Sequence, residues 1–283
     1  MSLKSVISMT TRASDLDSRR HVNNRTYEQL CAEGRLRLLE EQGYPVEVLL
    51  SKGISLRPMS SFVRFALQQM AGATLIIQTE AFPSDAGVIL WNHHIRQPDG
   101  KNVCQLQARS ETLDDQYRPM DLLPAANEEP VQIHIEQVPD FSGNCERVSS
   151  SYSVIYTDLD VFGELPFAAY WRIFEEARHM FGEQLGLTPE RLFQLDTNIF
   201  WVAGTYQYAK TIQAGQRVRI YTWLERVVRI RAYIRQEIWT ADGAELLGAS
   251  REEHMTVSMS KGRVRGMPAE MQRMLAPYLE FQG

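Results

Sequence analysis

The sequence predicts an α+β protein made of two copies of one domain, each with one long helix and several antiparallel strands. The chain has 283 residues, enough for about two domains at ~150 residues each. The triplet Asp-Leu-Asp occurs twice, at residues 15–17 and 158–160, which is an offset of 143. The same offset carries Asp-Gly from residues 99–100 to 242–243 without a gap. We therefore predict a tandem duplication.

Each copy shows the same order of predicted elements. A short strand-like run opens each copy, at residues 3–12 and 150–157. A helix is expected next, over 24–42 and 167–182, because apolar side chains recur there at helical spacing and a glycine follows. Four strand-like runs complete each copy, and in the second copy they lie at 199–211, 217–227, 228–240 and 245–259.

The repeat sets the expected domain boundaries. The two domains should cover residues 1–125 and 149–262, with a linker at 126–148 and a C-terminal tail at 263–283. Within the linker, apolar and polar residues alternate over 131–136, which predicts a short strand.

The amino-acid composition is that of an ordinary globular protein and argues against several other classes. The chain is 44% hydrophobic and 23% charged, as in ordinary globular domains, and its net charge of −5 argues against a dedicated nucleic-acid binder. Its three cysteines include no Cys-x-x-Cys pair, which is typical of a reducing compartment. We see no signal sequence at the N-terminus and no run of the ~18 apolar residues that a membrane span needs. A cytoplasmic protein without nucleic-acid partners or a membrane span is expected.

The repeated triplet belongs to a longer motif. Residues 15–27 read DLDSRRHVNNRTY, and residues 158–170 read DLDVFGELPFAAY. The first string resembles the signature of hotdog-fold thioesterases: Asp-x-Asp, then Gly-His-Val-Asn-Asn or a variant, then tyrosine, with an acidic residue and an arginine on the following helix. The second string resembles the same signature without its His-Val-Asn-Asn part.

The resemblance implies a tandem (double) hotdog fold, in which a curled antiparallel sheet wraps a long central helix in each copy. It places the chain with 4-hydroxybenzoyl-CoA thioesterase-like and acyl-ACP thioesterase-like enzymes. Such an enzyme hydrolyses an acyl-CoA or acyl-ACP thioester to a free acid and a thiol, with no metal and no cofactor. Two alternatives stay open: a hotdog-fold dehydratase-hydratase acting on 3-hydroxyacyl or enoyl thioesters, and a non-catalytic acyl-thioester-binding protein. The acyl chain, the choice between coenzyme A and carrier protein, and a homo-oligomeric state also stay open.

Thioester hydrolysis needs an activated water or a nucleophile, and a group that polarises the carbonyl. We expect Asp17 to be the catalytic carboxylate, because it lies just before a helix whose free N–H groups suit an oxyanion. His21 is the second catalytic candidate, to orient substrate or share the proton transfer. Asn23 and Asn24 either bind the carbonyl or cap the helix, and capping is also the alternative for Asp17.

The remaining candidates contact substrate or belong to the second copy. Tyr27 and Glu33 are expected near the substrate, although Glu33 could instead pair with an arginine elsewhere. The second-copy counterparts are Asp160, Glu164 and Glu176. Because Glu164 replaces a histidine and adds a repelling carboxylate, we expect one productive site per chain, centred on Asp17.

Overall fold

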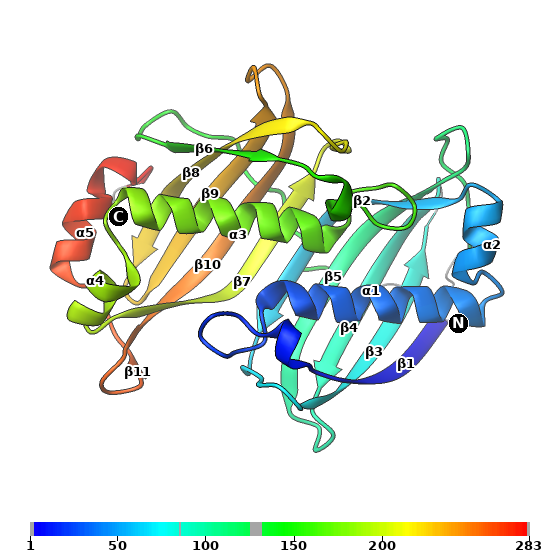
Figure 1. The fold of residues 1–283 in the computed structure, drawn as a ribbon, viewed down its shortest axis with the longest axis horizontal. Coiled ribbons are helices and arrows are strands. Elements are labelled where there is room, and N and C mark those ends of the chain that lie inside the picture. Colours follow the sequence, from blue (N-terminus) through cyan, green and yellow to red (C-terminus); the bar gives the residue numbers. More distant parts are fainter. Residues whose placement is uncertain (1–2, 85, 125–131, 282–283) are drawn as a thin grey trace. The chain divides into compact units, whose positions relative to one another are not determined.

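The computed structural model describes residues 3–84, 86–124 and 132–281 (Figure 1). The chain divides into two units. The first unit consists of Met1–Glu136 and Tyr156–Trp171, and the second of Gln137–Ile155 and Arg172–Gly283. A segment of the second sequence copy therefore packs within the first unit. None of the helices in the described ranges is long and apolar enough to cross a membrane.

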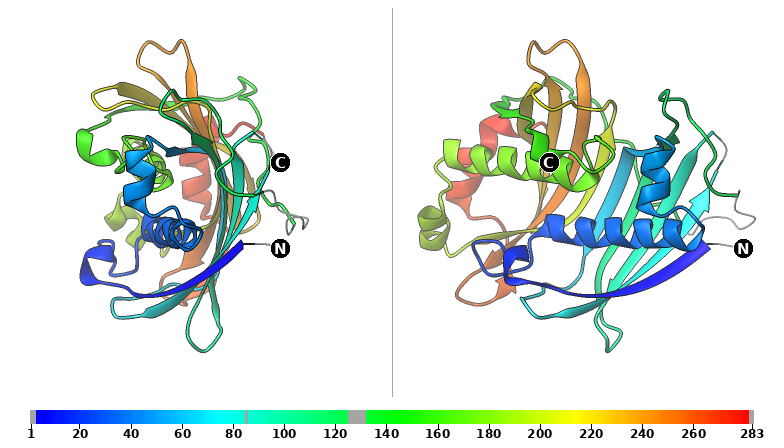
Figure 2. Two further views of the ribbon diagram at one scale, coloured as in Figure 1. Left: turned by 90° about the vertical axis from the view of Figure 1, so that its right-hand side faces the viewer. Right: turned by 45° about the vertical axis from the view of Figure 1, so that its right-hand side comes forward.

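The first unit is one antiparallel sheet with a long helix on its face. Its helices are α1 (Asn24–Glu41) and α2 (Val46–Ser51). Its strands are β1 (Leu3–Thr10), β2 (Ser55–Phe65), β3 (Thr74–Pro83), β4 (Val88–Arg96) and β5 (Asn102–Leu113). They pair in the order β1-β3-β4-β5-β2. The sheet curves around α1 (Figure 2), and Leu38, Ile77 and Trp91 are fully buried between them.

The second unit has the same layout. Its helices are α3 (Phe167–Gln184), which begins in the first unit, α4 (Pro189–Gln194) and α5 (Ala269–Leu275). Its strands are β6 (Val148–Ser153), β7 (Asn198–Tyr208), β8 (Arg217–Val228), β9 (Arg231–Thr240), β10 (Leu246–Ser258) and β11 (Arg263–Val264). They pair antiparallel in the order β7-β10-β9-β8-β6, and β11 adds to β10.

The elements of the two sequence copies recur at the offset found in the sequence. Both ends of α1 and of α2 lie 143 residues before the ends of α3 and of α4. The two strand orders also match when β2, β5, β4, β3 and β1 are set against β7, β10, β9, β8 and β6. The prediction of an α+β chain with antiparallel sheets is confirmed.

The strand predicted at 131–136 is wrong for the part that the structure describes, since residues 132–136 form no strand and Val131 lies outside the described residues. The nearby strand β5 already pairs with β4 on one edge and β2 on the other, so its backbone has no edge left to offer. The Gln107 side chain binds the segment instead. Its Nε2 donates to the Gln132 carbonyl at 3.0 Å, and its Oε1 accepts from the His134 N–H at 2.8 Å.

The residues after 262, expected to be a tail, add to the core of the second unit. Met267, Met271 and Leu275 are buried and pack in one cluster with Phe181 of α3 and Leu192 of α4.

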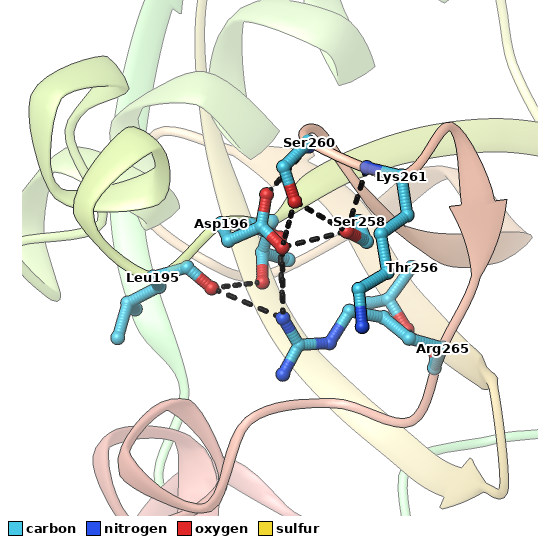
Figure 3. A network of polar contacts seen from close by, with 8 residues as sticks. Leu195, Asp196, Thr256, Ser258, Ser260, Lys261 and Arg265 are labelled. Carbon is cyan, nitrogen blue, oxygen red and sulfur yellow. Dashed lines mark hydrogen bonds and ion pairs between the residues drawn. The ribbon is translucent and has the colours of Figure 1, made fainter.

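Asp196, in the turn between α4 and β7, holds the β10–β11 hairpin in place (Figure 3). Its carboxylate accepts from Ser258 Oγ at 2.6 Å, from Ser260 N at 2.6 Å and from Ser260 Oγ at 3.0 Å. Arg265 Nη1 lies 3.5 Å from the same carboxylate. These contacts stabilise the chain where it turns toward α5.

Candidate functional site

Asp17 lies in a tight turn just before α1, and the turn fixes its carboxylate. Its Oδ1 accepts from the N–H groups of Arg19 at 2.8 Å and His21 at 3.0 Å. Its own N–H donates to the His21 carbonyl at 2.8 Å. Among the described residues, Oδ2 has no hydrogen-bond partner, and the side chain is half-buried. The backbone N–H groups therefore occupy Oδ1, and Oδ2 is the carboxylate oxygen that is available to react.

Asn23, not Asp17, caps α1. Its side-chain oxygen accepts from the Arg25 N–H at 2.9 Å, and its own N–H donates to the Asp15 carbonyl at 2.8 Å. This confirms the capping alternative for Asn23. Asn24 is the first residue of the helix and, like the His21 side chain, is half-exposed close to Asp17 in the chain.

Asp160 lies in a turn of the same geometry in the second copy. Its Oδ1 accepts from the N–H groups of Phe162 at 2.9 Å and Glu164 at 3.1 Å, and its N–H donates to the Glu164 carbonyl at 2.9 Å. Each bond repeats one of Asp17 at the offset of 143. The repeat thus preserves the position of the carboxylate even though the neighbouring side chains differ.

A cavity of about 710 Å³ lies beside Asp160, within the first unit. Its walls are Arg35 and Leu36 of α1, strands β2 and β5, and the segment from Tyr156 to Phe167. The lining is mostly apolar, and the volume is in the range of small-molecule sites. The Phe167 residue lines the cavity, and Glu164 is not among the lining residues.

A buried polar cluster that sequence reasoning missed supports one wall of this cavity. The Arg35 guanidinium pairs with Glu28, which lies two helical turns earlier on the same face of α1, and its Nη1 lies 3.3 Å from His93 Nε2. His93 Nδ1 in turn lies 3.0 Å from the Thr79 hydroxyl. Arg35 also stacks 5.0 Å from the centre of the Phe167 ring. Burial raises the pKa of Glu28, and Arg35 opposes that rise.

A second buried carboxylate, Glu252 of β10, organises the interior of the second unit. It accepts from the Tyr206 hydroxyl at 2.8 Å, pairs with Arg178 of α3, and lies 3.0 Å from His254 Nε2. Arg178 corresponds to Arg35 at the repeat offset. The recurrence of an arginine at this helix position was visible in the sequence, but its carboxylate partner differs between the copies.

The remaining candidates differ in burial, since Tyr27 is buried whereas Glu33 and Glu176 are exposed. Tyr27 is only 2% exposed, packs 5.5 Å from the Phe65 ring centre, and has a raised pKa, chiefly because of burial. Glu33 and Glu176 are exposed, line no part of the cavity beside Asp160, and form no ion pair with any residue in the described ranges. Their roles in substrate binding stay predictions.

Asp160→Asn should stabilise the protein at pH 8 and have no such effect at pH 4. Burial raises the pKa of Asp160 to about 6. The two hydrogen bonds from backbone N–H groups favour the charged carboxylate and oppose this rise. The folded chain therefore binds a proton more tightly than the unfolded chain, and wild-type stability falls as the pH rises from ~4 to ~6. An asparagine keeps Oδ1 as the acceptor and carries no charge.

We expect the free energy of unfolding to rise by on the order of 1–2 kcal/mol at pH 8, after allowance for solvent screening. Urea unfolding at both pH values measures it. An equal effect at pH 4 and pH 8, or a loss of stability at pH 8, would contradict the assignment.

Both the sequence and the fold of this chain are similar to those of known proteins. The family model of the thioesterase-like superfamily matches residues 11–140 and 154–275. Among solved structures, the 12:0-ACP thioesterase from Umbellularia californica has a TM-score of 0.71 at 12% identity, covering 90% of this chain and 94% of that one.

An acyl-ACP thioesterase from Bacteroides thetaiotaomicron has a TM-score of 0.60 at 12% identity, with 89% and 97% covered. At this identity the two structures show the fold alone, which is that of hotdog-fold thioesterases. A comparison with curated proteins finds no match. The family model spans most of the chain and both sequence copies, and on that ground the chain belongs to the thioesterase-like superfamily.

Proposed function

We propose that the chain is a tandem double hotdog that hydrolyses an acyl-CoA or acyl-ACP thioester to a free acid and a thiol. The observation that carries this proposal is the Asp17 carboxylate, with Oδ1 held by two backbone N–H groups and Oδ2 without a partner among the described residues. Family membership and the repeat of helices and strand order support it. The two copies proposed are residues 1–125 and 149–262, and residues after 262 add to the core of the second.

In the proposed reaction Asp17 is the general base. Its Oδ2 takes a proton from water, and the water oxygen attacks the thioester carbonyl carbon. The C–S bond then breaks, and the leaving thiolate takes the proton from Asp17, which returns to the carboxylate form. The N-terminal end of α1 carries a positive partial charge that favours the developing oxyanion. His21 and Asn24 are the side chains proposed to orient the substrate, on a helix start that Asn23 holds in place.

The cavity beside Asp160 is proposed to take an apolar acyl chain without hydrolysing it. Its lining is mostly apolar, and the His-Val-Asn-Asn string that accompanies Asp17 is missing from this copy. One productive site per chain is therefore proposed. Calorimetric titration with a non-hydrolysable acyl-CoA analogue counts the sites, and two equivalent sites per chain would exclude this arrangement.

The place of action proposed is the cytoplasm. All three cysteines are free thiols, as in proteins of a reducing compartment.

A thiol-release assay tests the activity. Acyl-CoA and acyl-ACP substrates of several chain lengths are incubated with the protein, and free thiol is measured with a chromogenic reagent. We expect release with at least one substrate. Absence of thiol release, together with a change in enoyl-thioester absorbance, would identify the dehydratase-hydratase alternative instead.

A further inference from the structure

An aspartate turn of one geometry occurs at Asp114 as well as at Asp17 and Asp160. Asp114 Oδ1 accepts from the N–H groups of Gln116 at 2.9 Å and Arg118 at 2.9 Å, and its own N–H donates to the Arg118 carbonyl at 2.9 Å. Asp17 and Asp160 make the same three bonds in their own turns. The turn therefore uses only Oδ1, and the surroundings decide what Oδ2 meets.

The surroundings of Oδ2 differ between Asp114 and Asp160. Asp114 Oδ2 accepts from Arg118 Nε at 2.9 Å, so the arginine four positions on neutralises the carboxylate. At Asp160 the residue four positions on is Glu164, and residues 155–168 contain no lysine or arginine. Among the described residues, Asp160 Oδ2 accepts no hydrogen bond, and Asp160 lines the cavity. An ionised Asp160 is therefore not neutralised by any cation of its own turn.

The other ionisable groups of the cavity wall do not neutralise Asp160 either. Besides Asp160, the lining contains Arg35 and Tyr156. The Arg35 guanidinium is paired with the buried Glu28, so this pair brings no net charge to the wall. His93, behind Arg35, is buried, and burial lowers its pKa and keeps the ring neutral. Tyr156 is 83% exposed, and a phenol is neutral near pH 7.

The strands and the turn beside the cavity add no cation to it. β2 and β5 line it with side chains that do not ionise, and the flanking Arg57 and Glu111 pair with each other. Glu164 lies outside the lining, and its charge opposes the ionisation of Asp160. In the described part of the chain, Asp160 is thus the one carboxylate of this mostly apolar lining, and it has no counter-ion.

We propose that the cavity binds its apolar ligand together with one proton, which Oδ2 of Asp160 takes up from the solvent. This rests on the proposed function, in which the cavity holds an acyl chain. A charged Oδ2 needs water, and an apolar ligand displaces that water. Leaving an unpaired carboxylate against hydrocarbon costs more than protonating it. The protonated group still accepts the two backbone N–H bonds through Oδ1.

The sign of the pH dependence follows from this linkage. Burial already raises the pKa of Asp160 to about 6, and a bound apolar ligand should raise it further. The occupied cavity then holds the proton more tightly than the empty one. Affinity should therefore be complete below pH ~6 and fall as the pH rises above that value.

Titration with 1-decanol, an apolar chain without a charge at any pH used, tests the proposal. Its dissociation constant is measured by calorimetry at pH 5 and pH 8, and buffers of different ionisation enthalpy count the protons taken up at pH 7. The variants are Asp160→Asn and the matched control Asp114→Asn, which makes the same change in a turn of the same geometry outside the cavity lining. A third variant, Ala32→Phe, adds a ring to the wall that α1 contributes.

The wild type should bind decanol about 10- to 100-fold more weakly at pH 8 than at pH 5, since each pH unit above the pKa costs up to tenfold. It should take up close to one proton for each decanol bound. Asp160→Asn should bind equally at both pH values without proton uptake, and Asp114→Asn should behave as the wild type. Ala32→Phe should weaken binding at pH 5, which places decanol in this cavity.

Three results would overturn the proposal: a wild type with equal affinity at pH 5 and pH 8, a pH dependence that persists in Asp160→Asn, or decanol binding that Ala32→Phe leaves unchanged. A wild type that does not bind decanol at either pH would also overturn it. Thiol release is not measured in this experiment, so a failure of the Asp17 mechanism is seen separately.

Discussion

Asp17→Asn should lower kcat by about 10²-fold or more, the usual scale for loss of a general base. The amide oxygen of asparagine can still accept from the N–H groups of Arg19 and His21, which now bind Oδ1 of the aspartate. The substitution therefore keeps the turn and replaces only Oδ2, the oxygen without a partner among the described residues. We expect KM to change much less than kcat, because the turn and the start of α1 remain in place.

Asp160→Asn is the matched control for this experiment. It makes the same change in a turn of the same geometry, where no histidine or asparagine pair follows the carboxylate. Its effect on kcat should be smaller than that of Asp17→Asn. The kcat of both variants is measured as the rate of thiol release per enzyme molecule, and circular dichroism shows whether each variant is folded. Wild-type turnover in a folded Asp17→Asn protein would show that the reaction does not depend on this carboxylate.

The helices were predictable from sequence because local signals agree with the repeat. The helix predicted at 24–42 is observed at Asn24–Glu41, and the helix predicted at 167–182 is observed at Phe167–Gln184. An asparagine cap begins the first, and glycines with positive φ, Gly43 and Gly186, follow both. Caps and glycine stops are local features, so a single sequence records them.

Tertiary partners were not predictable in this way. The alternation over 131–136 is a correct strand pattern, but strand formation needs a free sheet edge, and β5 has none. The pairing of Glu28 with Arg35 across two helical turns also needed the fold, because only burial against β3 and β4 distinguishes it from a surface pair. The cavity beside Asp160 depends on a segment of the second copy packing within the first unit, which no local pattern encodes.

Arg35→Met should destabilise the protein by about 3–5 kcal/mol, the range for removal of one partner from a buried ion pair. Glu28 is 1% exposed, and its Oε2 already lacks a hydrogen-bond partner among the described residues. Without Arg35 its charge would be buried and uncompensated, so the pKa of Glu28 should rise further above its ordinary value. The folded variant would then bind a proton more tightly than the unfolded chain, and its loss of stability should shrink as the pH falls toward ~4.

Two further variants separate burial of charge from loss of packing. Arg37→Met changes an exposed arginine on the same helix, 51% exposed and paired with exposed glutamates, and should cost less than about 1 kcal/mol. The double variant Glu28→Leu/Arg35→Met removes both charges and should recover most of the stability, since apolar replacement of a whole buried pair is often neutral. Urea unfolding measures all three proteins. If the double variant is as unstable as Arg35→Met alone, then the stacking of Arg35 on Phe167, and not its pairing with Glu28, is what holds α1 at this wall of the cavity.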